Sequence, residues 1–428
     1  MVLLAGDILA FLLALWLTLF SRRLQVPDWA TISQNLPPYL LLFILWLIVF
    51  FAADLYGRQT ILFKKKLPRT ILNAQIANIL LAVLFFYVFP FGIAPKTNLV
   101  LYLVWSFLII VFWRRFLFAK IYRPRKESLL FLCSGSEVEE VKAEFQNDRH
   151  YNVKVLADES AADLAKSGAS LVVVNLYDHS LESSLPGYYA FFRKGGRFVN
   201  FDELYEQMFN RVPLGLINER WFLENVSNDK KPFYTFAKRA IDLVLAFILG
   251  LISLVFYPFV WLAIKLEDRG PIFIAQERIG QNGKQVRIYK FRTMTGNDNG
   301  KYGQSGATSF KITRVGRFLR PTRIDELPQL WNVWRGDISL IGPRLELPSL
   351  VKQYEQEIPF YSIRHLIAPG LSGWAQIYQE NHPHSHVATE ATREKLSYDL
   401  FYIKNRSLWL DLTITLRTIK TLLSRSGI

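Results

Sequence analysis

The stretch 240-AIDLVLAFILGLISLVFYPFVWLAI-264 decides how the C-terminal half of this chain can fold. A basic cluster flanks it on each side, Lys238–Arg239 before it and Lys265 with Arg269 after it. Because Lys and Arg collect on the cytoplasmic side of a bilayer, a simple crossing would place one cluster outside. A helix that enters the inner leaflet, breaks at Pro258 and returns keeps both clusters inside, since proline removes a backbone donor and kinks a helix. By the residues alone, an ordinary proline-kinked span is equally open.

Four other apolar runs lie in the first 120 residues, at 2–20, 39–53, 71–91 and 99–113. A bilayer core of ~30 Å needs roughly 20 helical residues, so the first and third runs are long enough and the other two can extend into apolar flanks. The pattern predicts a four-helix transmembrane domain over residues 1–120.

Basic residues predict the orientation of these helices. Most of them lie in two connecting segments, which the positive-inside rule assigns to the cytoplasm together with both ends of the domain. Arg22 and Arg23, on the outer side, count weakly against this orientation. The residues of the two segments are Arg58, Lys64, Lys65, Lys66 and Arg69, and then Arg114, Arg115, Lys120, Arg123, Arg125 and Lys126.

Charge divides the chain into three blocks. The formal net charge of +15 combines +11 in residues 1–126, −8 in 127–229 and +12 in 230–428. Hydrophobic residues make up 51% of the chain, which excludes disorder, and the single Cys133 excludes a disulfide scaffold and a multi-cysteine zinc site.

The acidic block predicts a small cytoplasmic Rossmann-like α/β domain over residues 125–229. Short β-rich runs at 129–132, 151–156 and 171–174 surround a helical pattern at 137–145. A dinucleotide-binding loop after the first strand would need Gly-x-Gly-x-x-Gly, and only Gly135 is present. A folded spacer or regulatory module is therefore favoured over a working nucleotide site.

The last block combines many arginines with one acidic pair, Asp325-Glu326. Arginine presents a planar fork that matches phosphate oxygens two at a time. Nucleic acid is not expected as a partner, because the basic residues alternate with membrane-type apolar stretches and no nucleic-acid-binding module is recognisable. The basic segments are Gln276–Gly280, Tyr289–Met294, the set Arg314, Arg317, Arg320 and Arg323, and Gly342–Arg344.

The acidic pair fits a phosphate-transfer site with a divalent ion. Adjacent residues on a helix point ~100° apart, so the two carboxylates are expected to differ in role. Mg²⁺ takes one or two carboxylates plus substrate phosphates, while an aspartate can attack phosphorus. The alternative is a helix N-terminus capped by Thr322, with Asp325 at its third position; capping and catalysis are compatible.

The ordered motifs of the last ~190 residues resemble the bacterial sugar transferase family, the polyprenyl-phosphate glycosyl-1-phosphate transferases. Several motifs in one order are specific where any single one would be weak. The N-terminal part is similar to large-subtype members of exopolysaccharide and O-antigen synthesis. The matching segments are Lys238–Asp242, Gly270–Gly280, Tyr289–Met294, Arg314–Arg320, Asp325–Leu330, Gly336–Arg344 and Pro369–Gln376.

This resemblance implies an α-rich catalytic domain over residues 233–428, with a re-entrant membrane helix at 238–265 broken at Pro258, and thereby places the domain in the cytoplasm. It implies Asp325 as nucleophile and Glu326 as ligand of Mg²⁺. It implies substrate-phosphate contacts from Arg320 and Arg344, with Lys290 and Arg292 as additional phosphate ligands.

Two positions depart from the family pattern. Tyr257 stands where the family has serine before the helix-breaking proline, and Leu345 replaces the second proline of Gly-Pro-Arg-Pro. The first change removes any role of the serine. The second keeps Arg344 and is expected to loosen the turn after it.

The implied activity is transfer of a sugar-1-phosphate from a UDP-sugar, UDP-glucose or UDP-galactose, to undecaprenyl phosphate, with release of UMP through a phosphosugar-aspartate intermediate. The implied setting is the bacterial cytoplasmic membrane, with membrane lipid and a second copy of the chain as partners. The alternatives are a membrane glycosyltransferase that releases UDP and a non-catalytic scaffold or regulator. No residue is assigned to reading the hexose.

His382, His384 and His386 alternate near the C-terminus, a spacing that metal sites also use. Pro383 and the polar neighbours favour a loop instead.

Overall fold

The computed structural model forms two compact units, Met1–Val174 with Ser180–Asn200, and Asn175–His179 with Phe201–Ile428. The predicted boundaries at 120, 125, 229 and 233 stay predictions. Arg58, Lys64–Lys66, Lys120–Lys126 and the three alternating histidines lie outside the described residues. The structure describes residues 2–53, 55–56, 67–89, 95–118, 127–147, 153–155, 164, 169–178, 184–226, 231–295, 311–378 and 389–424.

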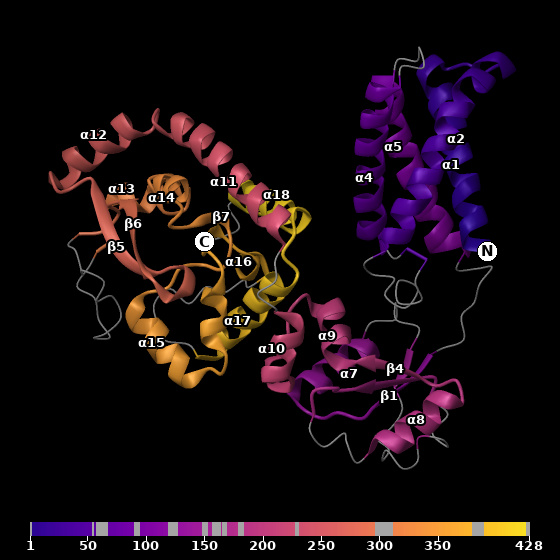
Figure 1. Cartoon of the computed structure of the whole chain (residues 1–428). Helices are drawn as coiled ribbons and strands as arrows, with labels where there is room; N and C mark the ends of the chain where they lie inside the picture. The colour runs from indigo at the N-terminus through magenta and orange to yellow at the C-terminus, as the bar shows by residue number, and fades with distance from the viewer. Residues whose placement is uncertain are drawn as a thin grey trace. The chain divides into compact units, whose positions relative to one another are not determined.

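Four long apolar helices form the N-terminal bundle (Figure 1). All four are long and apolar enough to cross a membrane, which confirms the predicted apolar helices. The second begins ten residues ahead of its apolar run and carries Pro37 and Pro38 inside it. The helices are α1 (Val2–Arg23), α2 (Trp29–Ala52), α4 (Leu67–Val88) and α5 (Pro95–Phe112).

An ion pair is buried inside this bundle. Asp7 on α1 is 0% exposed, and it accepts hydrogen bonds from Nε and Nη2 of Arg114, which is 5% exposed. The Tyr56 hydroxyl donates to Asp7 Oδ2 at 2.9 Å, and Arg114 Nη1 donates to the Leu55 carbonyl at 2.6 Å. Arg114 lies in a π-helical turn, η1 (Trp113–Leu117). Each charge is therefore paired and hydrogen-bonded, as burial requires.

Arg114→Gln is expected to destabilise the bundle by about 3–5 kcal/mol, because it leaves the Asp7 carboxylate buried without its partner. The double variant Asp7→Asn/Arg114→Gln should recover most of that loss. Thermal unfolding of the purified full-length chain in detergent measures both, with the exposed neighbour Arg115→Gln as matched control. An Arg114→Gln variant that unfolds at the wild-type temperature would contradict this account.

The first unit also contains a four-stranded parallel sheet in the order β2-β1-β3-β4. Its core comprises Leu130, Val172, Val174 and Phe191 with Leu164. The strands predicted at 129–132 and 171–174 and the helix predicted at 137–145 are confirmed, with every end within two residues of its predicted position. The elements are β1 (Glu127–Phe131), α7 (Ser136–Asn147), β2 (Val153–Val155), β3 (Leu171–Val174), α8 (Leu185–Arg193) and β4 (Arg197–Asn200).

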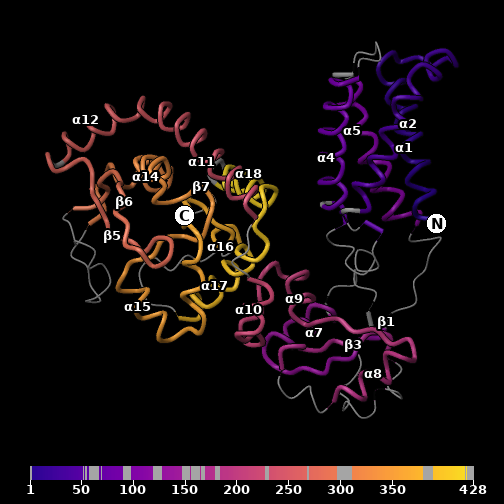
Figure 2. Tube along the Cα trace, viewed as in Figure 1, coloured from indigo at the N-terminus to yellow at the C-terminus, as the bar shows by residue number. Residues whose placement is uncertain are grey.

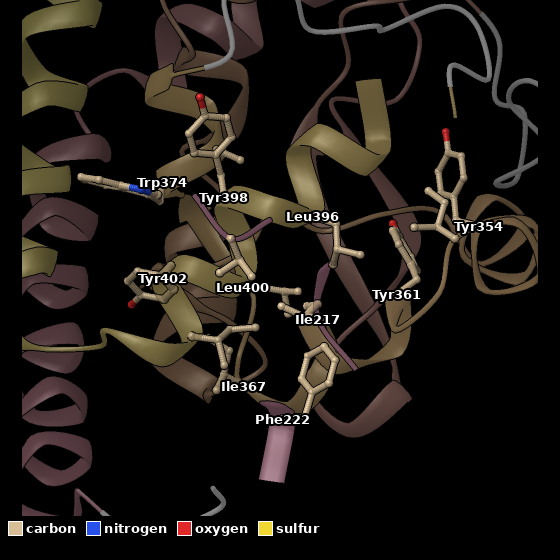
Figure 3. Close-up of a cluster of buried hydrophobic side chains, with 14 of the residues drawn as sticks. Ile217, Phe222, Tyr354, Tyr361, Ile367, Trp374, Leu396, Tyr398, Leu400 and Tyr402 are labelled. Atoms are coloured by element: carbon tan, nitrogen blue, oxygen red, sulfur yellow. The ribbon is translucent and has the colours of Figure 1, made fainter. Parts of the chain in front are cut away.

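Residues 201–226 belong to the core of the second unit. The Val212 amide donates a hydrogen bond to the Ser397 carbonyl at 3.1 Å, and the Ser397 hydroxyl donates one to the Val212 carbonyl at 2.6 Å. Ile217 and Phe222 lie in one cluster with Leu396, Leu400 and other C-terminal residues (Figure 3). The segment contains α9 (Phe201–Phe209), η4 (Leu214–Leu216) and α10 (Glu219–Asn225).

The apolar stretch that opened the sequence analysis forms two helices bent by 55°, α11 (Pro232–Ser253) and α12 (Tyr257–Asp268) (Figure 2). The break falls at residues 254–256, and Pro258 lies in the first turn of α12, where its missing N–H is not needed. Tyr257, at the position that departs from the family, packs edge-on against Phe291 with ring centroids 4.9 Å apart. The bend is compatible with a broken span and with a re-entrant helix.

The rest of the second unit is mainly helical, with two small two-stranded sheets, β5-β6 antiparallel and β7-β8 parallel. The elements are β5 (Phe273–Ile279), η5 (Gln281–Gly283), β6 (Gln285–Phe291), α13 (Arg314–Leu319), η6 (Ile324–Glu326), α14 (Gln329–Arg335), β7 (Ser339–Ile341), α15 (Pro348–Glu357), η7 (Tyr361–Leu366), β8 (Gly370–Ser372), α16 (Trp374–Tyr378), α17 (Thr389–Lys404) and α18 (Leu408–Ser424).

Candidate active site

The acidic pair lies in a short turn, η6, that follows α13. Arg323 adopts a left-handed conformation with φ 54°, which reverses the chain ahead of Asp325. The Glu326 amide then donates to the Arg323 carbonyl at 3.1 Å. The alternative in which Thr322 caps this turn is wrong, because the Thr322 hydroxyl donates back to the carbonyls of Phe318 and Leu319.

Three cations surround the Glu326 carboxylate. Lys290, on β6, donates to Oε1 at 2.8 Å, and Arg344 Nη2 lies 3.6 Å from the same oxygen. Arg323 Nη1 lies 3.4 Å from Oε2. Burial raises the pKa of Glu326, but Lys290, Arg344 and Arg323 outweigh it and hold that pKa far below its usual range. Glu326 is therefore a carboxylate at every physiological pH.

Asp325 has the opposite environment. It is 8% exposed, and no described residue donates a hydrogen bond to its carboxylate. Burial and the neighbouring charge of Glu326 raise the pKa of Asp325 to about 6, against the opposing effect of Lys290, Arg320 and Arg323. Its oxygens thus have no hydrogen-bond donor among the described residues and are only weakly stabilised as anions, which suits a nucleophile better than a structural ion pair.

The loop that carries Arg344 is held by a close backbone crossing between the segments around Gly342 and Gly370. The amide of Gly342 donates to the carbonyl of Ser372, and that of Gly370 donates to the carbonyl of Pro343, both at 2.9 Å. A Cβ on Gly370 would lie 2.1 Å from the Gly342 nitrogen, so only glycine permits this approach. The crossing places Arg344 beside Glu326.

The expected loosening of the turn after Arg344 stays a prediction, while the side chain of Leu345 gives this turn apolar contacts. That side chain packs against a buried cluster of Ala246, Ile288, Val333 and Ile338. The leucine supplies apolar contacts where the family has a rigid proline.

Not all of the predicted phosphate-binding residues meet at this pair. Lys290 and Arg344 contact Glu326, and the exposed Arg320 acts on Asp325 through its charge. Arg292 forms no ion pair with either carboxylate; its guanidinium lies over Gly270, where a Cβ would come within 1.9 Å of Nη1. Arg323, which the sequence analysis placed only among the basic segments, is a direct partner of Glu326. Its i,i+3 spacing from Glu326 was the sequence signal for this ion pair.

A magnesium ion fits this site only with help from substrate. Among the described residues no group of three or more His, Cys, Asp or Glu converges as a metal cage. Two adjacent carboxylates are nevertheless enough for Mg²⁺, which prefers one or two of them plus water and phosphate oxygens. Glu326 retains lone pairs beyond those that its three cations use.

The comparisons with known proteins agree with the sequence motifs. A family model described as bacterial sugar transferase matches residues 233–425. The chain is 44% identical over 204 residues to the UDP-N-acetylgalactosamine-undecaprenyl-phosphate N-acetylgalactosaminephosphotransferase of Aeromonas hydrophila, covering 46% of each protein. It is 39% identical to the UDP-glucose:undecaprenyl-phosphate glucose-1-phosphate transferase of Escherichia coli K12, over 42% of this chain and 39% of that protein.

The match thus spans less than half the length of these two relatives. A protein of Caulobacter vibrioides, also named UDP-glucose:undecaprenyl-phosphate glucose-1-phosphate transferase, is 41% identical over 191 residues, which are 44% of this chain and 70% of that protein. From this coverage and the family match, the chain belongs to the bacterial sugar transferase family.

Proposed function

We propose that this protein transfers a sugar-1-phosphate from a UDP-sugar to undecaprenyl phosphate and releases UMP. The observation that carries the proposal is the contrast between two adjacent acids: Asp325 is buried and accepts no hydrogen bond from a described residue, while Glu326 is held by three cations. The names of the relatives support the substrate classes.

Asp325 acts as the nucleophile. An oxygen of its carboxylate attacks the sugar-linked phosphorus, the bond from that phosphorus to the bridging oxygen breaks, and UMP leaves with the electron pair. An oxygen of undecaprenyl phosphate then attacks the same phosphorus, which releases the Asp325 carboxylate and forms the diphosphate-linked sugar. Splitting the transfer into two steps lets each substrate enter and leave separately.

Arginine and lysine side chains stabilise the charge on the transferring phosphoryl group. Arg344 Nη1 is buried and has no hydrogen-bond partner among the described residues, so it has a donor to offer a phosphate oxygen. Lys290, Arg320 and Arg323 add positive charge around the same turn. Positioning and charge stabilisation are the dominant contributions in phosphoryl transfer.

Glu326 would hold Mg²⁺ together with the diphosphate of the UDP-sugar. Bound there, the ion would neutralise charge on the phosphate oxygens. The chain itself supplies the fixed carboxylate, because Lys290 and Arg344 orient Glu326 and keep it ionised.

The bent helix pair α11 and α12 supports the proposed position of the site at the membrane surface. Apolar side chains on both helices are exposed and suit a lipid environment. A re-entrant path keeps the site in the cytoplasm, where UDP-sugars are made, and brings it to the bilayer surface where undecaprenyl phosphate presents its headgroup. The exposed side chains are Val244, Phe247, Ile248, Leu251 and Ile252 on α11, Val255 in the break, and Phe259 on α12.

The proposed setting is the cytoplasmic membrane of a bacterium, at the first membrane step of exopolysaccharide, capsule or O-antigen repeat-unit synthesis. The likeness to large-subtype members extends the proposal to a homodimer. The sugar is a UDP-linked hexose or N-acetylhexosamine, because the names of the relatives include both glucose and N-acetylgalactosamine.

The nucleotide product tests this function. Purified membranes incubated with Mg²⁺, undecaprenyl phosphate and UDP-glucose, UDP-galactose or UDP-N-acetylgalactosamine should release UMP with one of the sugars, and chelation of the divalent ion should stop the release. Release of UDP would instead indicate a glycosyltransferase, and no nucleotide product with any sugar would favour a scaffold.

Asp325→Asn should reduce UMP release by at least about 10⁴-fold, because the amide is a poor nucleophile, without changing membrane insertion. UMP release per amount of inserted protein measures the effect. Glu355→Gln, which neutralises an exposed acid on α15, is the matched control and should retain activity. Appreciable transfer by the Asp325→Asn variant would contradict the nucleophile assignment.

A further inference from the structure

A buried arginine outside the acidic pair holds the backbone of Arg344. Arg364, on η7, is 2% exposed, and its Nη2 donates a hydrogen bond to the Arg344 carbonyl at 2.9 Å. Arg344 in turn lies 3.6 Å from Glu326 through its own Nη2. One arginine therefore connects the protein interior to the phosphate-binding arginine.

The position of Arg364 is fixed by groups from η7 itself, from the loop before α15 and from α17. Its Nη1 donates to the Tyr361 hydroxyl at 2.6 Å and lies 3.7 Å from Glu346. Its Nη2 lies 2.8 Å from Asp399 of α17, as an ion pair without hydrogen-bond geometry. Burial lowers the pKa of Arg364, but Tyr361, Asp399 and Glu346 outweigh it and raise that pKa above its usual value.

The chain after Arg344 is held by the same network. Glu346 forms an ion pair with Lys395 of α17, and its carbonyl accepts a hydrogen bond from the Ile279 amide at 3.0 Å. Before Arg344, the crossing of Gly342 with Gly370 fixes the backbone. The hydrogen bond from Arg364 holds the backbone between these two fixed segments, at the carbonyl of Arg344.

We propose that Arg364 is a positioning residue for phosphate binding: by bonding the Arg344 carbonyl, it sets the guanidinium of Arg344 against Glu326 and the substrate diphosphate. The inference rests on the proposed function for its kinetic consequence, while the loop geometry that it explains does not depend on any reaction. A positioning role suits this chain in particular, because Leu345 removes the proline that would stiffen the same turn.

A double-mutant cycle separates positioning from general stabilisation. Arg364→Lys keeps the charge but loses the planar fork, so kcat/KM for UMP release should fall about 10- to 100-fold. In an Arg344→Lys background the same change should cost less than about 3-fold, because Arg364 acts through the side chain already altered. Equal losses in both backgrounds would overturn the proposal.

Arg211→Lys is the matched control. Arg211 also contacts α17, through Glu394 at 2.8 Å, and stacks on Tyr398, but it makes no contact with Arg344. Its substitution should leave the kinetics close to wild type. If Arg364→Lys fails to fold, Asp399→Asn replaces it in the cycle, because Asp399 contacts the nitrogen that bonds the Arg344 carbonyl.

Hydrogen–deuterium exchange of the full-length chain in detergent gives a readout independent of activity. The amides of Gly342 and of residues 344–346 should exchange at least about 10-fold faster in Arg364→Lys, and their exchange should be unchanged in Arg211→Lys. Unaltered exchange in Arg364→Lys would overturn the positioning role even if the enzyme is active. A wild-type chain that releases no UMP would contradict the proposed function alone, and the exchange result would still decide the role of Arg364.

Discussion

The carboxylate of Glu326, held by Lys290, Arg344 and Arg323, is the interaction on which the candidate site depends. It draws together a strand of the β5-β6 hairpin, the turn after α13 and the loop after β7. A buried carboxylate without these partners would be strongly disfavoured as an anion, and the cations without it would repel one another. The proposed substrate binding and the placement of Asp325 both depend on this arrangement.

The same arrangement explains how neighbouring acids acquire different chemistry. Glu326 takes the hydrogen bond and the close ion pairs, so its charge is fixed and available to a cation. Burial and the negative charge of Glu326 raise the pKa of Asp325, and its oxygens accept no hydrogen bond from the part of the chain that the structure describes. Local electrostatics, rather than residue type, divides the proposed roles of metal ligand and nucleophile.

Much of the site could be predicted from sequence because its parts lie in contiguous motifs. Asp325 and Glu326 are adjacent, Arg323 is three residues away, and Lys290 and Arg344 stand in recognisable strings. Arg292, which the family resemblance implies as a phosphate contact, stays a prediction; it follows β6, and its guanidinium lies over Gly270 rather than beside the acidic pair. The apolar runs likewise predicted the four helices of the bundle, since length and composition are local properties.

Contacts between distant residues could not be predicted. Arg364 and Asp399 are 35 positions apart, and Asp7 and Arg114 are separated by 107, so no local pattern reveals either pair. In the sequence, Asp7 is a lone acid within an apolar run and Arg114 one of many basic residues at a membrane edge. Only the tertiary fold turns these residues into buried ion pairs.

The mass of the intact protein tests the central claim, that Asp325 carries the sugar phosphate between the two substrates. The purified chain is incubated with Mg²⁺ and its UDP-sugar, without a lipid acceptor, and then given undecaprenyl phosphate. The account predicts a gain of one sugar phosphate, located on the peptide that contains Asp325 and lost when the acceptor is added. An unmodified protein that still releases UMP once both substrates are present would contradict it.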